Sequence, residues 1–268
     1  MENIGPNNFS SPGLTVRRIP ALEDNYIFLL IDAVSKTAAV VDPAEPQNVL
    51  AELKNNGLQL THLFNTHHHG DHVGANKALL AAFPDLQIYA GEHDRGRIPG
   101  ATHWLSDNST VKFAGHSGNV LFVPGHTRGH ICYFFSTTSP EGDLFIGDTL
   151  FGGGCGKLFE GTYAQMLSSL QKIRDLPDST RVWCAHEYTQ KNLEVAVQLG
   201  EKNQSLEHRL AEVKKVRANQ LPTVPLNLGT EKATNPFLRW DNLQLQSALG
   251  THGALETFTF VRDFRDRF

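Results

Sequence analysis

Cysteine is scarce in this chain of 268 residues, which contains only Cys132, Cys155 and Cys184. Their number is odd, they are scattered along the sequence, and no two of them form a Cys-x-x-Cys pair. This pattern excludes a disulfide framework and a zinc site built from paired thiolates, and it fits a reducing compartment.

Charged residues and long apolar runs are also few. Asp, Glu, Lys and Arg make up 19% of the chain, below the usual quarter, which argues against a disordered protein. The formal net charge of -4 argues against nucleic acid as a partner, because polynucleotide binders normally present a basic surface. No run approaches the roughly 18 apolar residues of a membrane span, and Met1–Pro12 has neither the basic nor the apolar region of a targeting signal. We therefore expect a cytoplasmic globular protein without a membrane partner.

Short β-rich runs dominate the first two thirds of the chain. Several are continuous apolar runs, such as Ile27–Ile31, which are typical of strands covered on both faces. Amphipathic helices are expected between them, at Pro46–Asn56, His72–Phe83 and Thr162–Asp175. The mixture predicts an α/β fold of packed sheets covered by helices. The expected strands are Thr15–Pro20, Tyr26–Asp32, Thr37–Asp42, Thr61–Asn65, Leu86–Ala90, Val120–Val123, Ile131–Ser136, Leu144–Ile146 and Arg181–Cys184.

The composition changes after Tyr188. Two helices are expected at Thr189–Leu199 and Gln204–Ala218, and shorter ones at Asp241–Leu249 and Leu255–Arg267. This stretch is too helical and too poor in strands to belong to the same sheets. We therefore predict one domain over residues 1–188 and a smaller, all-helical domain over residues 189–268.

Histidine, by contrast, is abundant, with 13 residues, and its densest group is the segment Thr66–His72. The segment follows an apolar strand and precedes a helix. His67 and His69 share one face of an extended chain, and Gly70 permits a turn that brings Asp71 and His72 toward the same space. A single catalytic ion takes about three protein ligands and leaves one position for water. The density of this group therefore predicts two metal ions.

Three further candidate ligands, His126, Asp148 and His186, each stand just after a short expected strand, where functional sites commonly collect. A carboxylate such as Asp148 can bridge two ions, whereas an imidazole cannot. Taken singly, each residue could be a cap or a hydrogen-bonding group, and the histidine triplet alone could be an adventitious surface chelator. Their shared position favours metal binding. We expect His130, in the same loop as His126, to support the site without binding metal.

The order and spacing of these residues resemble the metallo-β-lactamase superfamily over about residues 22–188. This resemblance implies a four-layer αββα sandwich with a dinuclear site at one edge. One ion would be held by His67, His69 and His126. The other would be held by Asp71, His72 and His186, with Asp148 as the bridge.

Further segments resemble the hydroxyacylglutathione hydrolases, the glyoxalase II family of this superfamily. The family implies a monomer with two divalent ions, most often Zn²⁺, although N/O ligation also admits iron or manganese. It implies hydrolysis of S-D-lactoylglutathione and other 2-hydroxyacyl-glutathiones to glutathione and a 2-hydroxy acid such as D-lactate, in methylglyoxal detoxification. The matching segments are Asp24–Tyr26, Cys155–Thr162, Ala185–Thr189, Thr223–Pro225, Asn235–Arg239 and Arg262–Phe268.

The family's glutathione contacts map to Lys157, Phe159, Tyr188, Arg262 and Arg265. Two positions depart from the pattern. Phe159 stands where some members have tyrosine, so a hydroxyl contact is missing. Arg265 stands where others have lysine, which keeps the charge but changes its geometry.

The expected mechanism follows from this site. Two ions that share a water lower its pKa toward neutrality and provide a hydroxide that attacks the thioester carbonyl. Asp71 and Asp148 are the expected catalytic carboxylates. The leaving thiolate needs no strong general acid, because an ordinary thiol has a pKa of about 8.5.

Several alternatives stay open at this level. Gly152–Lys157 looks superficially like a phosphate loop, but Phe151 and Leu158 break the required pattern, so we expect its glycines to permit close backbone approach. Cys155 could be a nucleophile, although a metal site makes one unnecessary. Arg262 and Arg265 could lie on a solvated helix face. The alternative functions are a persulfide dioxygenase of the same superfamily, with one iron, and a non-catalytic metal-binding protein.

Overall fold

The structure is a computed structural model that describes residues 8–11, 14–136 and 142–268. The chain divides into two compact units, the first of Met1–Phe122 with Gly129–Gly147 and the second of Val123–Arg128 with Asp148–Phe268. Residues 1–7 and 12–13, where no targeting signal is expected, lie outside the described residues. None of the helices in the described ranges has the length and apolar character needed to cross a membrane.

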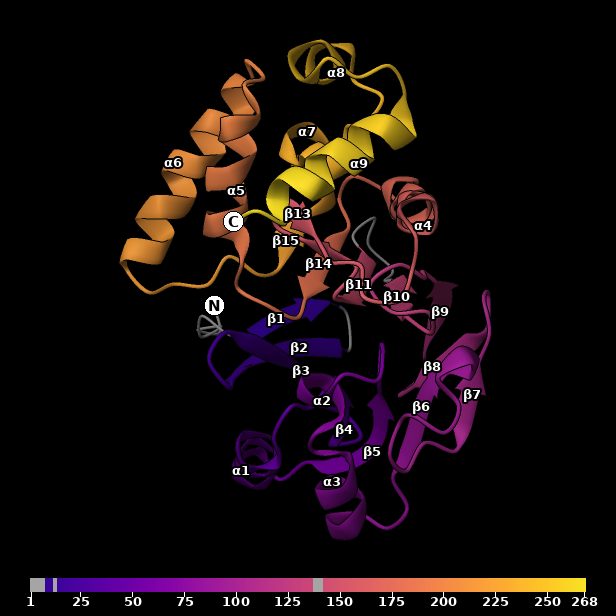
Figure 1. Ribbon diagram of the computed structural model, residues 1–268. Coiled ribbons are helices and arrows are strands. Elements are labelled where there is room, and N and C mark those ends of the chain that lie inside the picture. Colours follow the sequence, from indigo (N-terminus) through magenta and orange to yellow (C-terminus); the bar gives the residue numbers. More distant parts are fainter. Residues whose placement is uncertain (1–7, 12–13, 137–141) are drawn as a thin grey trace. The chain divides into compact units, whose positions relative to one another are not determined.

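A seven-stranded sheet, with its strands in sequence order, forms the centre of the first unit (Figure 1). The strands from β1 to β4 pair antiparallel, and those from β4 to β7 pair parallel. The apolar run predicted to be covered on both faces lies in β3, which is buried along its whole length. The strands are β1 (Asn8–Ser11), β2 (Leu14–Ala21), β3 (Asn25–Asp32), β4 (Thr37–Val41), β5 (Gln59–Phe64), β6 (Gln87–Gly91) and β7 (His103–Leu105).

Four further strands of the first unit pair antiparallel in succession and pack against this sheet through aromatic side chains. Phe28 lies 5.8 Å from Phe145, and Phe64 lies 5.1 Å from Tyr133, measured between ring centroids. The Tyr133 hydroxyl donates to the Asn65 carbonyl at 2.8 Å. The four strands are β8 (Thr110–Phe113), β9 (His116–Phe122), β10 (Ile131–Ser136) and β11 (Gly142–Gly147).

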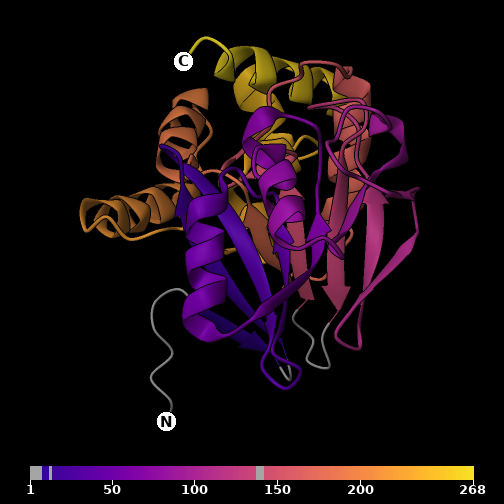
Figure 2. The ribbon, with the colours of Figure 1, turned by 90° about the horizontal axis from the view of Figure 1, so that it is seen from below.

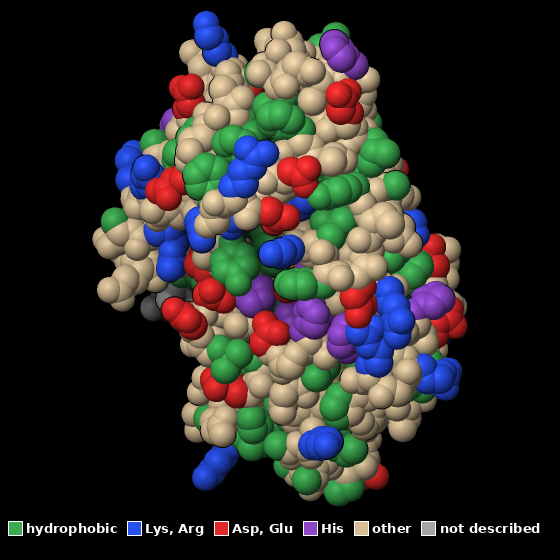
Figure 3. All heavy atoms as spheres, in the orientation of Figure 1, with side chains coloured by type: hydrophobic (Ala, Val, Ile, Leu, Met, Phe, Trp, Pro, Cys, Tyr) green, Lys and Arg blue, Asp and Glu red, His purple; other side chains and the backbone are tan. Residues whose placement is uncertain are grey.

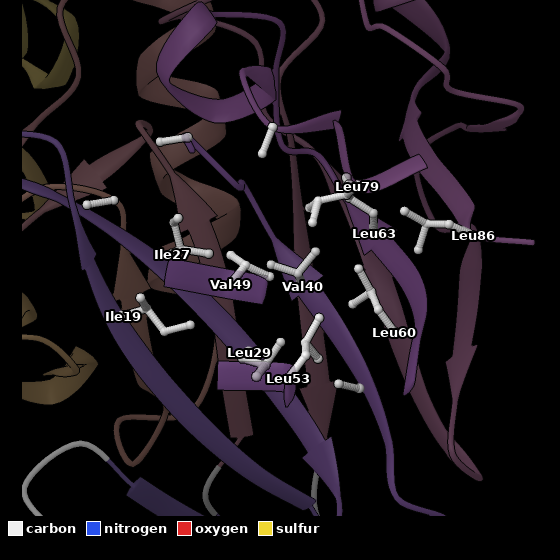
Figure 4. Close-up of a cluster of buried hydrophobic side chains, with 14 of the residues drawn as sticks. Ile19, Ile27, Leu29, Val40, Val49, Leu53, Leu60, Leu63, Leu79 and Leu86 are labelled. Carbon is white, nitrogen blue, oxygen red and sulfur yellow. The ribbon is translucent and has the colours of Figure 1, made fainter. Parts of the chain in front are cut away.

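Helices α1 (Pro46–Asn56) and α3 (Asn76–Ala82) cover the other face of the seven-stranded sheet. Figure 4 shows their side chains meeting those of the strands in one apolar cluster, with Val49 and Leu53 from α1 beside Leu29 from β3. Figure 2 shows α1 along the strands of this sheet. The first unit therefore has helix, sheet and sheet as successive layers. The single turn η1 (Glu92–Asp94) follows β6.

The single helix predicted over His72–Phe83 is wrong, because the structure has a short α2 (Gly70–Val73) and a separate α3. Tertiary hydrogen bonds interrupt the helix. The Asn65 amide donates to the His72 carbonyl at 2.8 Å, and the Ala75 N–H donates to the Pro43 carbonyl at 2.9 Å. The Ala75 N–H therefore cannot donate within one helical ladder, and the His72 carbonyl is shared with the Asn65 amide.

The second unit is mainly helical. Helix α4 begins at the predicted Thr162 cap, where Thr162 and Gln165 form a reciprocal capping box. Helices α5 and α6 pack through Leu193, Leu206 and Val213. The helices are α4 (Tyr163–Arg174), α5 (Thr189–Ala196), η2 (Val197–Leu199), α6 (Gln204–Ala218), α7 (Leu228–Thr234), η3 (Pro236–Leu238), α8 (Leu243–Leu249) and α9 (Ala254–Arg265).

Two pairs of short strands accompany these helices. Strand β15 (Leu226–Asn227) pairs with β14 (Arg181–Cys184), so the expectation that nothing after residue 188 would join a sheet is wrong at this point. Strands β12 (Leu150–Phe151) and β13 (Gly154–Cys155) form a hairpin, which we call the glycine hairpin.

Candidate metal centre

The first unit presents four of the predicted ligands on the segment that follows β5. His67 Nε2 lies 3.0 Å from His69 Nδ1, and His72 Nε2 lies 3.5 Å from Asp71 Oδ2. Donor atoms held about 2.0–2.2 Å from one tetrahedral ion are roughly 3.3 Å apart. The spacing within each pair therefore suits a shared divalent ion.

Two supporting residues hold these ligands in place. Asp42, at the end of β4, accepts hydrogen bonds from the Thr66 N–H at 2.8 Å and from His72 Nδ1 at 3.0 Å. The Asn25 amide donates to Asp71 Oδ2 at 3.0 Å. A carboxylate on the far nitrogen of an imidazole fixes its tautomer and directs the other nitrogen to a metal. Asp42, directly after β4, was not among the residues predicted for the site.

The other two histidines of this region have different surroundings. The His68 ring packs against that of His69, with 4.8 Å between centroids, and its Nε2 lies 2.5 Å from Arg97 Nη2. His130 is fully buried, and its ring stacks on that of His67 at 4.7 Å between centroids. His130 therefore packs behind a predicted ligand, which agrees with a supporting role.

The second unit brings together the remaining three predicted ligands. Asp148 Oδ2 lies 3.4 Å from His126 Nε2, and Asp148 Oδ1 lies 3.4 Å from His186 Nε2. Each carboxylate oxygen thus faces a different imidazole, which is the geometry of a bridging ligand. His126 Nδ1 donates to the Lys157 carbonyl at 2.7 Å, so Nε2 is the nitrogen left for a metal.

In the sequence, the glycine hairpin lies between Asp148 and Lys157, the residue whose carbonyl accepts from His126. A Cβ on Gly156 would lie 1.9 Å from the Asp148 carbonyl oxygen, so only glycine permits this backbone approach. The phosphate-loop alternative is excluded, because the segment forms a hairpin and not a strand-to-helix turn. Cys155 is buried, and burial raises the pKa of its thiol to about 11, which argues against its use as a nucleophile.

The candidate substrate residues are exposed to different degrees. Lys157 and Phe159 are exposed, and the Lys157 ammonium lies 5.9 Å from the Phe159 ring centroid. Tyr188 is half-buried and stacks on His186 at 4.8 Å between centroids. Phe159 therefore lies beside His126, with 5.3 Å between ring centroids, Tyr188 lies beside His186, and Lys157 lies next to Phe159.

The two arginines of α9 differ from one another. Arg262 is only 4% exposed, and it donates to the Cys155 carbonyl at 2.8 Å and to Asp266 at 2.9 Å, so the alternative of a solvated helix face does not hold for it. Arg265 is half-buried and donates to the Asn192 side-chain oxygen at 3.0 Å. Burial, and then the charge of Arg262, lower the pKa of Arg265.

The donor set consists of nitrogen and oxygen atoms, which suits a divalent ion of the zinc, iron or manganese type. On the face drawn in Figure 3, several histidine side chains reach the surface, and basic side chains there are interspersed with acidic ones. Among the residues that the structure describes, those with ligand atoms placed to hold a metal ion are His67, His69, Asp71, His72, His126, Asp148 and His186.

Comparison with known families and structures agrees with this picture. The model of the metallo-β-lactamase superfamily matches residues 25–186. A metallo-β-lactamase from Staphylococcus aureus has a similar structure, with a TM-score of 0.64 at 21% identity over 95% of this chain and 72% of that one. A solved structure described as TTHA1623 in a di-iron-bound form has a TM-score of 0.52 at 26% identity, over 63% of this chain and 91% of that one. The fold and the donor set thus define a metal-dependent enzyme of this superfamily.

Residues 187–268 show which family of this superfamily the chain belongs to. The model of the hydroxyacylglutathione hydrolase C-terminus matches residues 187–268. A hydroxyacylglutathione hydrolase from Gloeothece citriformis is 54% identical over 257 residues, which cover 95% of this chain and 100% of the relative. This chain belongs to the hydroxyacylglutathione hydrolase family. The predicted α/β fold with a helical C-terminal part is confirmed.

Proposed function

We propose that this enzyme hydrolyses 2-hydroxyacyl-glutathione thioesters, S-D-lactoylglutathione foremost, to glutathione and a 2-hydroxy acid such as D-lactate, as a step in methylglyoxal detoxification. The observation that carries the proposal is the complete nitrogen and oxygen donor set in a chain whose C-terminal part also matches the hydrolase family. Full-length relatives with this activity in their names support the same substrate class.

The enzyme is proposed to hold two divalent ions, with Zn²⁺ as the first choice. His67, His69 and His126 would bind one ion, Asp71, His72 and His186 the other, and Asp148 both. The contacts of the two Asp148 oxygens with different imidazoles and the di-iron form of the related solved structure support two ions over one. When bound, such ions make hydroxide available at neutral pH and polarise the thioester carbonyl.

The protein's own groups prepare this chemistry. Asp71 and Asp148 are the proposed catalytic carboxylates, because they are the acidic members of a set otherwise made of imidazoles. The Asn25 amide orients Asp71, and the Lys157 carbonyl keeps the proton of His126 on Nδ1. Asp42 does the same for His72, so both imidazoles present Nε2 to a metal.

The glutathione moiety is proposed to contact Lys157, Phe159, Tyr188, Arg262 and Arg265. Glutathione carries two carboxylates, which suit the cations of this group. Exposed Lys157 and half-buried Arg265 are placed to form charged contacts, and the Phe159 ring offers an apolar surface without the missing hydroxyl. We further propose a monomer with domains at 1–188 and 189–268, a division supported by the two family matches that meet at residues 186 and 187. Three buried free cysteines support a reducing compartment such as the cytoplasm.

One sample of purified protein tests the function and the metal content together. We expect loss of the thioester absorbance of S-D-lactoylglutathione and close to two metal equivalents per chain. Asp148→Ala should lower kcat by at least ~100-fold, because it removes the bridging carboxylate. Asp175→Ala changes an exposed aspartate at the end of α4 and should leave the rate unchanged.

The alternative functions give different results in the same experiment. One iron per chain with oxygen uptake on glutathione persulfide would replace the hydrolase by a dioxygenase. Metal-loaded protein that is inert toward a panel of thioesters would indicate a non-catalytic metal-binding protein. Full activity of Asp148→Ala would contradict the bridging role.

A further inference from the structure

The backbone of the glycine hairpin is held by buried side chains of the C-terminal part of the chain. The Asn235 amide donates to the Phe151 carbonyl at 3.1 Å and to the Gly154 carbonyl at 3.0 Å. The Gly153 N–H donates to Glu231 Oε2 at 2.9 Å. Asn235 and Glu231 are both 0% exposed, and the Asn235 amide also donates to Glu231 Oε2 at 3.1 Å. One carboxyamide and one carboxylate thus satisfy three backbone groups of the hairpin.

Two further residues of the C-terminal part complete these contacts. The Asn192 amide donates to the Gly152 carbonyl at 3.1 Å, and Arg262 donates to the Cys155 carbonyl at 2.8 Å. Every residue from 151 to 155 therefore has a backbone group bonded to a side chain from after residue 188. The packing is tight as well, because a Cβ on Gly154 would lie 2.4 Å from the Asn192 side chain.

The hairpin is joined at both ends to proposed metal ligands. At its start, Asp148 lies two residues before Leu150, the first residue of β12. At its end, the Gly156 N–H donates to the Thr149 carbonyl at 3.2 Å, and the next residue, Lys157, accepts the hydrogen bond of His126 Nδ1. A displacement of the hairpin would therefore move the backbone next to Asp148 and the carbonyl that orients His126.

We propose that Asn235 and Glu231 are positioning residues for the metal centre, acting on Asp148 and His126 through the glycine hairpin. This inference rests on the proposed function, since it assumes that those ligands serve the thioester reaction. It assigns the C-terminal part a second task beside glutathione binding. Neither residue is one of the substrate contacts proposed above, so their effect should appear in kcat and in metal affinity more than in KM.

Asn235→Ala tests this directly, because it removes the donor to both hairpin carbonyls. We expect kcat to fall roughly 10- to 100-fold, the usual effect of losing a residue that orients a metal ligand. The affinity for Zn²⁺, measured on the full chain by competition with a chromophoric chelator, should fall by a similar factor. KM should change less than about threefold.

Glu231→Gln is the second variant, and it decides the matter if Asn235→Ala does not fold. It keeps an oxygen that can accept from Gly153 but loses the charged contact with Arg209, so we expect a smaller shift in the same direction. The matched control is Glu201→Gln, which changes another buried carboxylate of the C-terminal part. Its partner is Arg239, and it should lower thermal stability without moving kcat or Zn²⁺ affinity.

The outcomes separate a positioning role from a merely structural one. Unchanged kcat and Zn²⁺ affinity in folded Asn235→Ala and Glu231→Gln would overturn the proposal, as would a rise in KM alone. If the wild-type chain does not hydrolyse the thioester, the proposed function fails, but the chelator competition still decides whether these residues position the metal ligands.

Discussion

Two of the candidate ligands, His72 and His126, each have a hydrogen-bond acceptor on the imidazole nitrogen Nδ1. For His126 the acceptor is the Lys157 carbonyl, and for His72 it is the Asp42 carboxylate. A carbonyl accepts but never donates, so it favours the tautomer that carries its proton on Nδ1. The backbone of Lys157 therefore serves the metal site, while its side chain is proposed to serve the substrate.

Cys155 is the residue whose environment most clearly excludes a chemical role. With a pKa raised to about 11 by burial, its thiol is only about one part in a thousand ionised at pH 8. We expect the native protein to react with an aromatic disulfide reagent at pH 8 far more slowly than the unfolded chain, which should titrate all three cysteines. Cys155→Ala should keep kcat within about threefold.

The same shift has a consequence for stability. The folded state raises the pKa of Cys155 above the value in the unfolded chain, so folding favours the neutral thiol. This contribution is fully present below the unfolded pKa of about 8.5 and is lost as the pH rises toward 11. In denaturant titrations, the free energy of unfolding of Cys155→Ala should therefore fall less steeply with pH over that range than that of the wild-type chain. Rapid labelling of Cys155 at pH 8, with loss of activity, would contradict this.

At the scale of single elements, helix ends were predictable where neighbours in the sequence determine them. The Thr162 cap and the end of α1 at Gly57, with its left-handed φ of 60°, are local features that residue type alone indicates. The break between α2 and α3 was not predictable. It depends on Asn65, which follows β5, and on Pro43, in the loop between β4 and α1. Only the folded sheet brings these two residues beside α2 and α3.

Helix α9 presents its two proposed glutathione residues three positions apart, yet with different partners. Arg262 donates to the Cys155 carbonyl of the glycine hairpin, and Arg265 donates to the Asn192 side chain. We expect Arg265→Ala to raise KM for the glutathione thioester about 10- to 100-fold with little change in kcat, since a charged hydrogen bond contributes roughly 1.5–3 kcal/mol. Arg262→Ala should raise KM and also lower kcat, because it releases the Cys155 carbonyl.

Steady-state kinetics on the two variants and on Arg267→Ala provide the comparison. Arg267 is exposed just beyond α9 and serves as the matched control, with no change expected in either constant. An unchanged KM in Arg265→Ala would show that this residue does not contact glutathione.

At the scale of the whole molecule, the α/β fold and the helical C-terminal part could be predicted because both depend on local pattern and composition. The seven candidate ligands could be named because four of them lie on one short segment and the other three each follow a strand. Asp42 could not, since its role depends on the parallel pairing of β4 with β5, which sets Asp42 beside Thr66. The contacts of Asn235 with the hairpin, 81 and 84 positions away in the sequence, could not be predicted either, because they too depend on the tertiary fold.

Removal of metal should lower the stability of the folded chain, because the proposed ions bind the folded protein and not the unfolded chain. An ion present at 100 times its Kd stabilises the folded state by about 2.7 kcal/mol, which for a chain of this size raises Tm by roughly 5–10 °C. We expect a loss of this order after chelation, and its recovery with Zn²⁺, in scanning calorimetry.

Variants from each unit show where this stabilisation originates. His69→Ala in the first unit and His186→Ala in the second should each lose at least half of the metal-dependent rise in Tm. Each variant removes a ligand from one of the two proposed ions. His93→Ala is the matched control, since His93 is an exposed histidine outside the donor set. If either ligand variant keeps the full metal-dependent shift, its residue does not hold an ion. If both lose it, His69 and His186 each hold an ion whose binding stabilises the folded chain.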